Sequence, residues 1–596
     1  MLNINLTKPV TSMLLKNSDR FPESAAMKKF LKSINDLPKQ LQGRTLFLDL
    51  SERRLTMISY YIFELEDLEE LHLEKNLIES IPENIRHLQN LKVLYLNNNS
   101  LKYISEEFGE LKNLENLDLS SNPLPPIALQ TVSRIYTLRE LRLYNIHLEE
   151  FPVQICRYLH HLELLGLSGN NLTFLPKEIV NLSQLKELYL QQNKFETFPL
   201  QLCKLYNLEV LDMEKNAMSS IPEEISSLSK LMKLFLGFNV VELLPDSLYR
   251  CRELSVLTAP GNLLSTVPGN LGELTELSEL ELSDNNLKML PLQLCFLTSL
   301  CVLYLKNTRL KMLPPAFVEL TAVQILNLGQ NLFRDFPIEI CSLINLEILS
   351  LDDNRLRKIP SGIKELSKLK HLGLSGNRFS RFPKEILSLV SLKKLYIGQD
   401  QGTKLKVLPD NIYKLENLRE LYLENNRLES LPSTIGLLKY LEILDCTNNY
   451  LTALPHSICE IQGMKKLLLV NNMLNELPEN LDMLQNLEDL LVDKNPITDP
   501  PPEVWSQGKE AIWNYLQDKR HKKFMAIKIQ AWWRGIMVRK GFGPFEYLLK
   551  LRKLKGKKGK KGKKGKKGKK GKKGKDKGKK GKDKGKDKGK AKGKKK

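Results

Sequence analysis

Several features that mark secreted, membrane-spanning or catalytic proteins are missing from this 596-residue sequence. No uninterrupted apolar run reaches the roughly 18 residues that a membrane-spanning helix needs. The first residues contain no sustained apolar segment of the kind found in signal peptides. The eight cysteines form no Cys-rich cap at either end, and Cys203, Cys295 and Cys341 recur at one position of a repeated pattern. We therefore predict a cytoplasmic protein that is neither secreted nor transmembrane.

Motifs for catalysis and metal binding are also lacking. The Gly-Leu-Ser-Gly stretches at Gly166 and Gly373 belong to the repeated pattern and are not the nucleophile turn of hydrolases. The Lys/Gly-rich end contains no Ser or Thr, so it cannot supply a phosphate-binding P-loop. The eight histidines do not have the spacing of metal ligands. We predict that the protein is not an enzyme, binds no metal ion and uses no cofactor.

Positive charge is distributed very unevenly. The formal net charge is +22, but residues 555–596 alone contain 26 lysines and three aspartates. Residues 509–554 add twelve basic and three acidic side chains, which leaves residues 1–508 with a net charge of −10. The Lys/Gly end has nothing apolar to bury, so we expect a disordered tail. Its partner would be a polyanion, namely anionic lipid, nucleic acid or an acidic protein tail, and such binding would favour a membrane-surface or nuclear association. The alternative is a tail that only solubilises.

One repeated unit fills most of the chain. From Leu185 to Asn207 it reads LKELYLQQNKFETFPLQLCKLYN, and a fixed period of 23 residues indicates a solenoid. The Leu-x-Leu alternation predicts a short strand with one buried face, and the later proline suits an irregular convex side. In this register twenty copies, the first imperfect, begin at 45, 68, 91, 114, 138, 162, 185, 208, 231, 254, 277, 300, 323, 346, 369, 392, 418, 441, 464 and 487.

An asparagine follows the second leucine of the strand by three residues in sixteen copies. Its amide is expected to turn inward and bond backbone groups of its own and the neighbouring copy. Ile146 and Thr308 occupy this position in two other copies, where we expect weak points. The sixteen asparagines are Asn76, Asn99, Asn122, Asn170, Asn193, Asn216, Asn239, Asn262, Asn285, Asn331, Asn354, Asn377, Asn426, Asn449, Asn472 and Asn495.

These patterns predict an α/β solenoid: a leucine-rich-repeat horseshoe with a parallel concave sheet, followed by a C-terminal helix and the disordered tail. A long coiled coil is excluded because no heptad survives a proline and an asparagine turn in each copy. The extra residues of Gly398–Lys404 are expected to form a loop. The predicted divisions are a cap region at 1–44 with a helix at Ser24–Ile34, repeats at 45–508, a cap helix and binding motif at 509–543, a basic amphipathic stretch at 544–554, and the tail at 555–596. The helix that closes the repeat core is expected over Glu503–Leu516, directly after three prolines.

Aromatic residues recur between the paired leucines, on the strand face that should line the concave surface. Exposed aromatics on such a surface suit a protein-binding role, although strands also favour aromatics for packing. Because the sheet should be long, we expect a protein or peptide ligand of unknown identity. The candidate partner-binding residues are Tyr95, Tyr189, Phe235, Tyr304, Tyr396 and Tyr422.

A second candidate site lies in the stretch FMAIKIQAWWRGIMVRKGF at 524–542. It fills the IQ pattern, in which Ile529 anchors in a hydrophobic groove, Gln530 bonds a linker backbone, and Arg534 and Arg539 meet an acidic partner. Gly535 would let that partner approach closely. A 1-5-8-14 pattern overlaps it, formed by Ile529, Trp533, Ile536 and Phe542, and is typical of helix-in-groove binding. The alternative is a helix that packs its Trp532 and Trp533 against the end of the repeats.

These motifs carry two resemblances. The LPxxIxxL segments and the ending PPPEVWSQGKEAIWNYL at 500–516 resemble intracellular leucine-rich repeats of the Ras-suppressor type over about residues 45–517. The IQ stretch resembles segments that bind calmodulin and light chains. The order of the two is similar to the leucine-rich repeat and IQ domain-containing protein family, from which the Lys/Gly tail departs.

The resemblances imply a non-enzymatic interaction scaffold that binds a protein ligand on the repeats and calmodulin or another EF-hand protein on the IQ stretch. Two alternatives remain open. One is an adaptor tethered to anionic membrane or nucleic acid through the tail. The other is a regulatory subunit in a small-GTPase or phosphatase pathway, which rests on fold analogy alone.

Overall fold

A computed structural model describes residues 46–400, 403–540 and 550–551, and the chain divides into two compact units after Leu516. The cap predicted for 1–44 with its helix at Ser24–Ile34 lies outside the described residues, as do the Lys/Gly tail and most of the stretch at 544–554. The two units are treated separately below.

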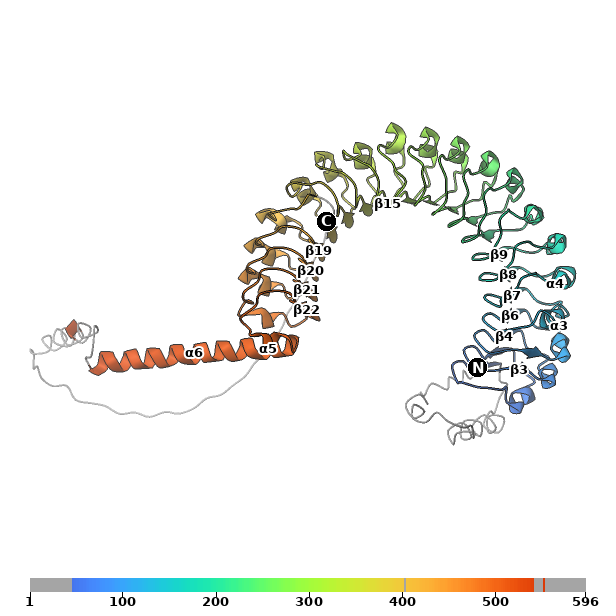
Figure 1. The fold of residues 1–596 in the computed structure, drawn as a ribbon, viewed down its shortest axis with the longest axis horizontal. Coiled ribbons are helices and arrows are strands. Elements are labelled where there is room, and N and C mark those ends of the chain that lie inside the picture. The colour runs from blue at the N-terminus through green and yellow to red at the C-terminus, as the bar shows by residue number, and fades with distance from the viewer. Residues whose placement is uncertain (1–45, 401–402, 541–549, 552–596) are drawn as a thin grey trace, which may run out of the picture. The chain divides into compact units, whose positions relative to one another are not determined.

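The first unit is a solenoid built on one parallel sheet of 20 strands. Each strand pairs with the strands of the preceding and following copies, so that Leu188 faces Leu211 and Leu211 faces Leu234. In Figure 1 the strands lie along the inner side of the arc of repeats, which confirms the parallel concave sheet. The strands are β1 (Phe47–Asp49), β2 (Glu70–His72), β4 (Val93–Tyr95), β6 (Asn116–Asp118), β7 (Glu140–Arg142), β8 (Leu164–Gly166), β9 (Glu187–Tyr189), β10 (Val210–Asp212), β11 (Lys233–Phe235), β12 (Val256–Thr258), β13 (Glu279–Glu281), β14 (Val302–Tyr304), β15 (Ile325–Asn327), β16 (Ile348–Ser350), β17 (His371–Gly373), β18 (Lys394–Tyr396), β19 (Glu420–Tyr422), β20 (Ile443–Asp445), β21 (Lys466–Leu468) and β22 (Asp489–Leu491).

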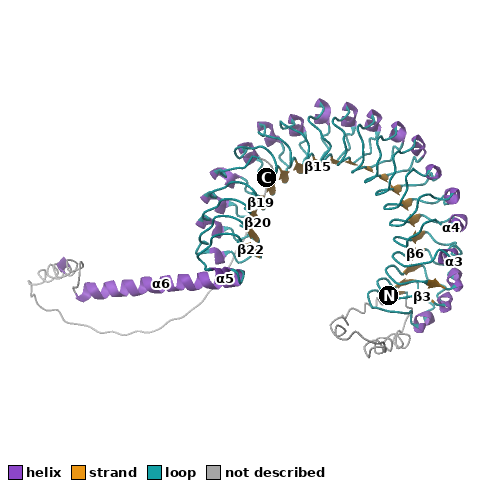
Figure 2. Ribbon diagram, in the orientation of Figure 1, coloured by secondary structure: helices purple, strands orange, loops and turns teal. Residues whose placement is uncertain are grey.

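The outer side of the arc is more regular than the sequence indicated, because most copies form one turn of 3-10 helix there (Figure 2). The proline of the repeat precedes this turn in an extended conformation, as Pro199 does before Leu200–Lys204. The turns are η2 (Tyr60–Glu64), η3 (Glu83–His87), η4 (Glu106–Glu110), η5 (Lys177–Asn181), η6 (Leu200–Lys204), η7 (Glu223–Ser227), η8 (Asp246–Arg250), η9 (Gly269–Glu273), η10 (Leu292–Phe296), η11 (Pro315–Glu319), η12 (Ile338–Ser342), η13 (Ser361–Glu365), η14 (Lys384–Ser388), η15 (Asp410–Lys414), η16 (Ser433–Leu437), η17 (His456–Glu460) and η18 (Leu481–Met483).

Two copies replace this turn with a short α-helix, α3 (Ala128–Val132) and α4 (Val153–Tyr158), and a small second sheet pairs β3 (Ser80–Ile81) with β5 (Tyr103–Ile104). Leucines of the strands and apolar residues of the outer turns meet in one continuous core. Cys203, Cys295 and Cys341 are free thiols buried in that core.

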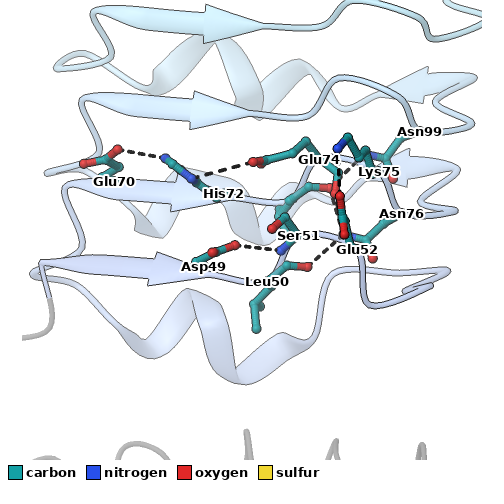
Figure 3. Close-up of polar contacts among 11 residues, drawn as sticks. Asp49, Leu50, Ser51, Glu52, Glu70, His72, Glu74, Lys75, Asn76 and Asn99 are labelled. Carbon is teal, nitrogen blue, oxygen red and sulfur yellow. Dashed lines mark hydrogen bonds and ion pairs between the residues drawn. The ribbon is translucent and has the colours of Figure 1, made fainter. Parts of the chain in front are cut away.

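The asparagine ladder is present. Asn193 donates from Nδ2 to the carbonyls of Leu190 and Leu167, each at 3.0 Å, and its Oδ1 accepts from the backbone N–H of Leu172 at 3.0 Å. All sixteen asparagines donate to carbonyls in their own copy and the preceding one. Figure 3 shows Asn76 reaching back to Leu50 in the first copy.

The two interruptions of the ladder behave differently. Ile146 is buried and offers no polar group, although its N–H still reaches Oδ1 of Asn170 in the next copy at 3.1 Å. Thr308 was expected to leave a gap, but its hydroxyl lies 2.9 Å from the carbonyl of Leu305 and 3.0 Å from Oδ1 of Asn331. The threonine hydroxyl therefore replaces the bond that a ladder asparagine makes to the carbonyl of its own copy.

The first unit ends in two helices where one was expected. The single cap helix predicted over Glu503–Leu516 is wrong, because the chain forms α5 (Pro502–Trp505) and then α6 (Lys509–Lys540). Gly508 separates them with a φ of 96°, a conformation that glycine adopts without strain. Ile512 and Leu516 of α6 are nevertheless buried in the core and close its end.

No helix in the described part of the chain is long and apolar enough to cross a membrane. Across the same residues, no group of three or more His, Cys, Asp or Glu side chains is placed to hold a metal ion.

Candidate binding surfaces

The IQ stretch lies on α6, which continues through the second unit to Lys540. Ile529, Trp533 and Ile536 fall on one face because residues four and three apart lie one turn apart on a helix. Ile529 and Trp533 are 61% and 56% exposed, and Ile536 is half-buried. Phe542, the last residue of the 1-5-8-14 pattern, lies outside the described residues.

Polar groups of the same motif are open to solvent. The Gln530, Arg534 and Arg539 side chains are exposed, and Gly535 is half-buried. No acidic residue occurs between 519 and 540, so this part of the helix carries only positive charge. Trp532 is 61% exposed. An exposed apolar face beside basic side chains suits an acidic partner with a hydrophobic groove.

The six concave aromatics all occupy the third position of a strand, as predicted. They are half-buried instead of exposed. Tyr396 and Tyr422, on neighbouring strands β18 and β19, stack with centroids 4.5 Å apart and an interplanar angle of 7°. Tyr95, Tyr189, Phe235 and Tyr304 lie on strands that are not adjacent to one another, so the structure brings together one pair and not a six-residue patch.

Carboxylates accompany two of these tyrosines. The Tyr189 hydroxyl donates to Glu187 Oε2 at 2.7 Å, and the Tyr422 hydroxyl donates to Glu420 Oε2 at 3.1 Å. Burial, followed by the nearby carboxylate, raises the pKa of both phenols above their usual range. The signal in the sequence was Glu-Leu-Tyr, because residues two apart in a strand share a face.

A histidine that sequence reasoning missed lies beside Tyr95. The rings of His72 and Tyr95 have centroids 4.8 Å apart, and Phe47 meets His72 edge-on at 5.1 Å. His72 Nε2 lies 2.8 Å from Glu70 Oε1 and Nδ1 lies 3.7 Å from Glu74 Oε1, as Figure 3 shows. His72 is the third residue of its strand, the position that Tyr95 holds in the next copy, so the pattern of concave aromatic residues extends to histidine.

Acidic side chains set the electrostatics of the concave face. Burial raises the pKa of Asp212 to about 6, although its carboxylate accepts a bond from the backbone N–H of Glu214 at 3.0 Å. Burial likewise raises the pKa of Glu281, Asp352 and Glu424 above the usual range for carboxyls. The concave face therefore presents carboxyls together with tyrosines, which suits a ligand with basic or hydrogen-bonding groups.

Comparison with known families matches the two parts of the chain separately. The family described as "Leucine rich repeat" matches residues 68–124, 137–195 and 344–401, and "Leucine Rich repeats (2 copies)" matches 416–458. The family described as "IQ calmodulin-binding motif" matches residues 526–543, which contain every residue predicted for that site.

Two curated relatives carry both parts in their name. "Leucine-rich repeat and IQ domain-containing protein 4" of Homo sapiens is 50% identical over 188 residues, which are 30% of this chain and 34% of the relative. The Mus musculus protein of the same name is 54% identical over 169 residues, 28% of each chain. The match thus spans about a third of the length of these relatives.

Solved structures show the same fold. The Leptospira interrogans LRR protein LIC12759 is 29% identical with a TM-score of 0.53, over 83% of this chain and 98% of that one. The plant peptide hormone receptor RGFR1, solved in complex with RGF2, is 28% identical with a TM-score of 0.55, over 75% of this chain and 78% of the receptor.

Proposed function

We propose that this chain, a leucine-rich-repeat protein with an IQ motif on its C-terminal helix, is a non-enzymatic scaffold that joins calmodulin or a related EF-hand protein to a protein ligand on its repeats. The observation that carries this proposal is the open face of α6. Ile529 and Trp533 are more than half exposed on a stretch without acidic residues, inside the segment that the IQ family matches.

The ligand on the repeats is proposed to be a polypeptide held on the concave sheet. Tyr396 and Tyr422 stack on each other, and beside them the Glu420 carboxylate accepts from the Tyr422 hydroxyl and pairs with Lys394 at 2.9 Å. Similarity to the plant peptide hormone receptor RGFR1, whose structure contains RGF2, supports a peptide-binding role for a solenoid of this kind. Tyrosine is enriched among the hot spots of protein interfaces.

The experiment compares calmodulin binding by the full chain and by an Ile529→Glu, Arg534→Ala variant. Charge at the groove anchor and loss of the guanidinium should abolish retention on calmodulin resin, both in EGTA and in calcium. The matched control is Val390→Glu with Lys384→Ala, which makes the same chemical changes at two exposed positions of the repeats. Full retention of the Ile529→Glu, Arg534→Ala variant would refute the assignment.

A further inference from the structure

A strip of basic side chains follows one edge of the solenoid across six consecutive copies, those that begin at 277 to 392. It uses three positions of the repeat: the first, third and fourth after the ladder position, where the chain leaves the carboxyl end of the strand. In the copy that begins at 392, which has three extra residues, these positions are counted from Leu405, the equivalent of Leu310. We call it the basic flank. Its members are Lys288, Arg309, Lys311, Arg334, Arg355, Arg357, Lys358, Arg378, Arg381, Lys404 and Lys406, and the same positions hold one acidic residue, Asp335.

The same positions have the opposite composition earlier in the solenoid. In the nine copies that begin at 68 to 254 they hold the lysines Lys102 and Lys194 and the glutamates Glu79, Glu149, Glu150, Glu196 and Glu242. There the geometry allows neighbouring copies to pair, since Lys102 Nζ lies 3.5 Å from Glu79 Oε2. The accumulation of positive charge is thus confined to one half of the edge and is not a property of the repeat.

The charges of the basic flank are not neutralised by the rest of the described chain. Ten of the eleven side chains are exposed and Lys404 is half-exposed. None of them takes part in an ion pair among the described residues, whereas pairs such as Lys186 with Glu163 (2.7 Å) and Lys465 with Glu442 (2.6 Å) join neighbouring copies elsewhere. The carboxylates of the adjoining turns, Asp284 and Asp353, instead accept from Asn307 and Gln330.

Apolar side chains interrupt the basic flank. Met289 and Met312 are 70% and 71% exposed, and Ile338 on the next turn is 66% exposed. Large apolar side chains that stay this open next to one another mark interaction sites. A shallow hollow beside them is lined by the basic residues Lys311, Arg334 and Arg355, the apolar residues Met312 and Ile338, and the acidic residues Asp335 and Glu339.

We propose that the basic flank binds an acidic polypeptide segment that carries apolar anchors. Arginine forks bind carboxylates with two parallel hydrogen bonds, and methionine adapts its shape to different apolar partners. Strands about 4.8 Å apart place six copies along roughly 25–30 Å, which an extended segment of about eight residues spans. Carboxylates would meet the arginines, and alternate apolar side chains would enter the hollow.

The composition of the flank favours a polypeptide over the other polyanions. Single-stranded nucleic acid is held by basic grooves in which aromatic rings stack on bases, and the three flank positions of these six copies contain no aromatic residue. Binding to a lipid surface needs charge alone and gives no role to the hollow. This surface differs from the concave sheet and the IQ helix of the proposed function, so either assignment can fail without the other.

The experiment places a photo-crosslinker, benzoylphenylalanine, at Met312 of the full chain. The probe is a 15-residue peptide of five Glu-Glu-Leu units, and crosslinking at position 312 reports occupancy of the flank independently of the Lys/Gly tail. The matched control site is Phe174, which occupies the same repeat position in an earlier copy and is 52% exposed. We expect at least tenfold more crosslinking at 312 than at 174, and loss of the signal with a Gln-Gln-Leu peptide.

Charge reversal then tests the arginines. Arg334→Glu, Arg355→Glu, Arg357→Glu and Arg378→Glu together should lower crosslinking at 312 at least tenfold. Lys112→Glu, Lys204→Glu, Lys414→Glu and Lys439→Glu, four exposed lysines on other surfaces, should not. Circular dichroism checks that both variants fold. Equal crosslinking in the two variants, or at 312 and 174, would overturn the proposal. If oligo-dT or phosphatidylserine vesicles inhibited crosslinking at position 312 more strongly than competing unlabelled peptide does, the proposal would also be overturned.

Discussion

Two buried polar residues of the repeats show how differently burial acts on an amide and on a carboxylate. The Asn193 side chain is 8% exposed, and both ends of its amide are bonded. Asp212 is 9% exposed, and its carboxylate accepts from the N–H of Glu214 while Glu214 adds a like charge nearby. A satisfied amide stabilises the fold at every pH, whereas a buried carboxylate destabilises it wherever it must be ionised.

Asp212→Asn should therefore stabilise the protein at neutral pH. Burial raises the pKa of Asp212 from the ordinary value of 3.8 to about 6, so the folded state binds more protons than the unfolded state between these values. Stability contributed by this site falls as pH rises from about 4 to about 6. The amide of the variant removes this loss of stability. A pKa shift of about two units corresponds to at most roughly 3 kcal/mol. Thermal unfolding should show a higher midpoint for the variant than for the unaltered protein at pH 7.5, and equal midpoints at pH 4.

Asp49 provides the control, because it holds the same strand position in β1. Burial there opposes ionisation, but hydrogen bonds from Ser51 and the charges of His72 and Arg53 hold the pKa below its ordinary value. Asp49→Asn should accordingly lower the midpoint at pH 7.5. A change of the same sign in both variants would contradict this account.

At the scale of the element, α6 serves two purposes along one helix. Its first two turns bury Ile512 and Leu516 in the repeat core, and its later turns carry the IQ residues. Gly535 lies in the interior of this second part, where glycine costs a helix about 1 kcal/mol relative to alanine. An added Cβ would find only Arg539 Nη2, at 3.7 Å, so packing within the helix does not explain the glycine.

Gly535→Ala separates helix stability from binding. The variant should slow amide exchange in the last turns of α6 in the free chain, yet weaken calmodulin binding about tenfold, because the methyl group occupies space that the partner needs. Hydrogen exchange and calorimetry measure the two effects. Ala531→Gly, at an exposed position of the same helix, should speed exchange with a smaller change in affinity. Binding of Gly535→Ala that equals or exceeds that of the unaltered chain would reject the role given to the glycine.

The elements differ in how far local sequence determines them. Leu188 and Leu190 predicted a strand and its buried face because alternation is a local property. The break between α5 and α6 was missed at Gly508, since a single glycine is tolerated inside many helices and only its φ shows the turn. Stacking of Tyr396 on Tyr422 was also missed, because the two residues are separated by the 26-residue copy and their register appears only in the sheet.

In the solenoid, each copy packs mainly against its neighbours, although the Thr258 hydroxyl also lies 3.3 Å from Glu214 Oε1 two copies away. Stability should therefore be distributed along the solenoid. Asn193→Ala leaves the N–H of Leu172 without its acceptor, at a cost of about 1–3 kcal/mol. Hydrogen exchange should speed up in the copies that begin at 162 to 208 and stay unchanged in those from 418 onward. Asn207→Ala, which removes an exposed hydrogen bond to the carbonyl of Ser183, should leave hydrogen exchange unchanged in both groups of copies. Uniform loss of protection would show that the solenoid unfolds as one body.

Charge is the property that whole-chain totals concealed. Residues 1–508 sum to −10, which hid eleven basic side chains on one edge of six copies. The basic flank becomes visible in the sequence when charged residues are grouped by their position in the repeat. What the sequence does not contain is the lack of ion pairs there, which depends on where the neighbouring copies place Asp284 and Asp353.

Strand pairing advances by one copy at a time, with Leu234 facing Leu257 and Leu257 facing Leu280. The strands of these successive copies thus meet through leucines at the same repeat position. Duplication or deletion of one 23-residue block creates no junction of a new kind, so such a gene can lengthen or shorten the arc stepwise while keeping both ends intact.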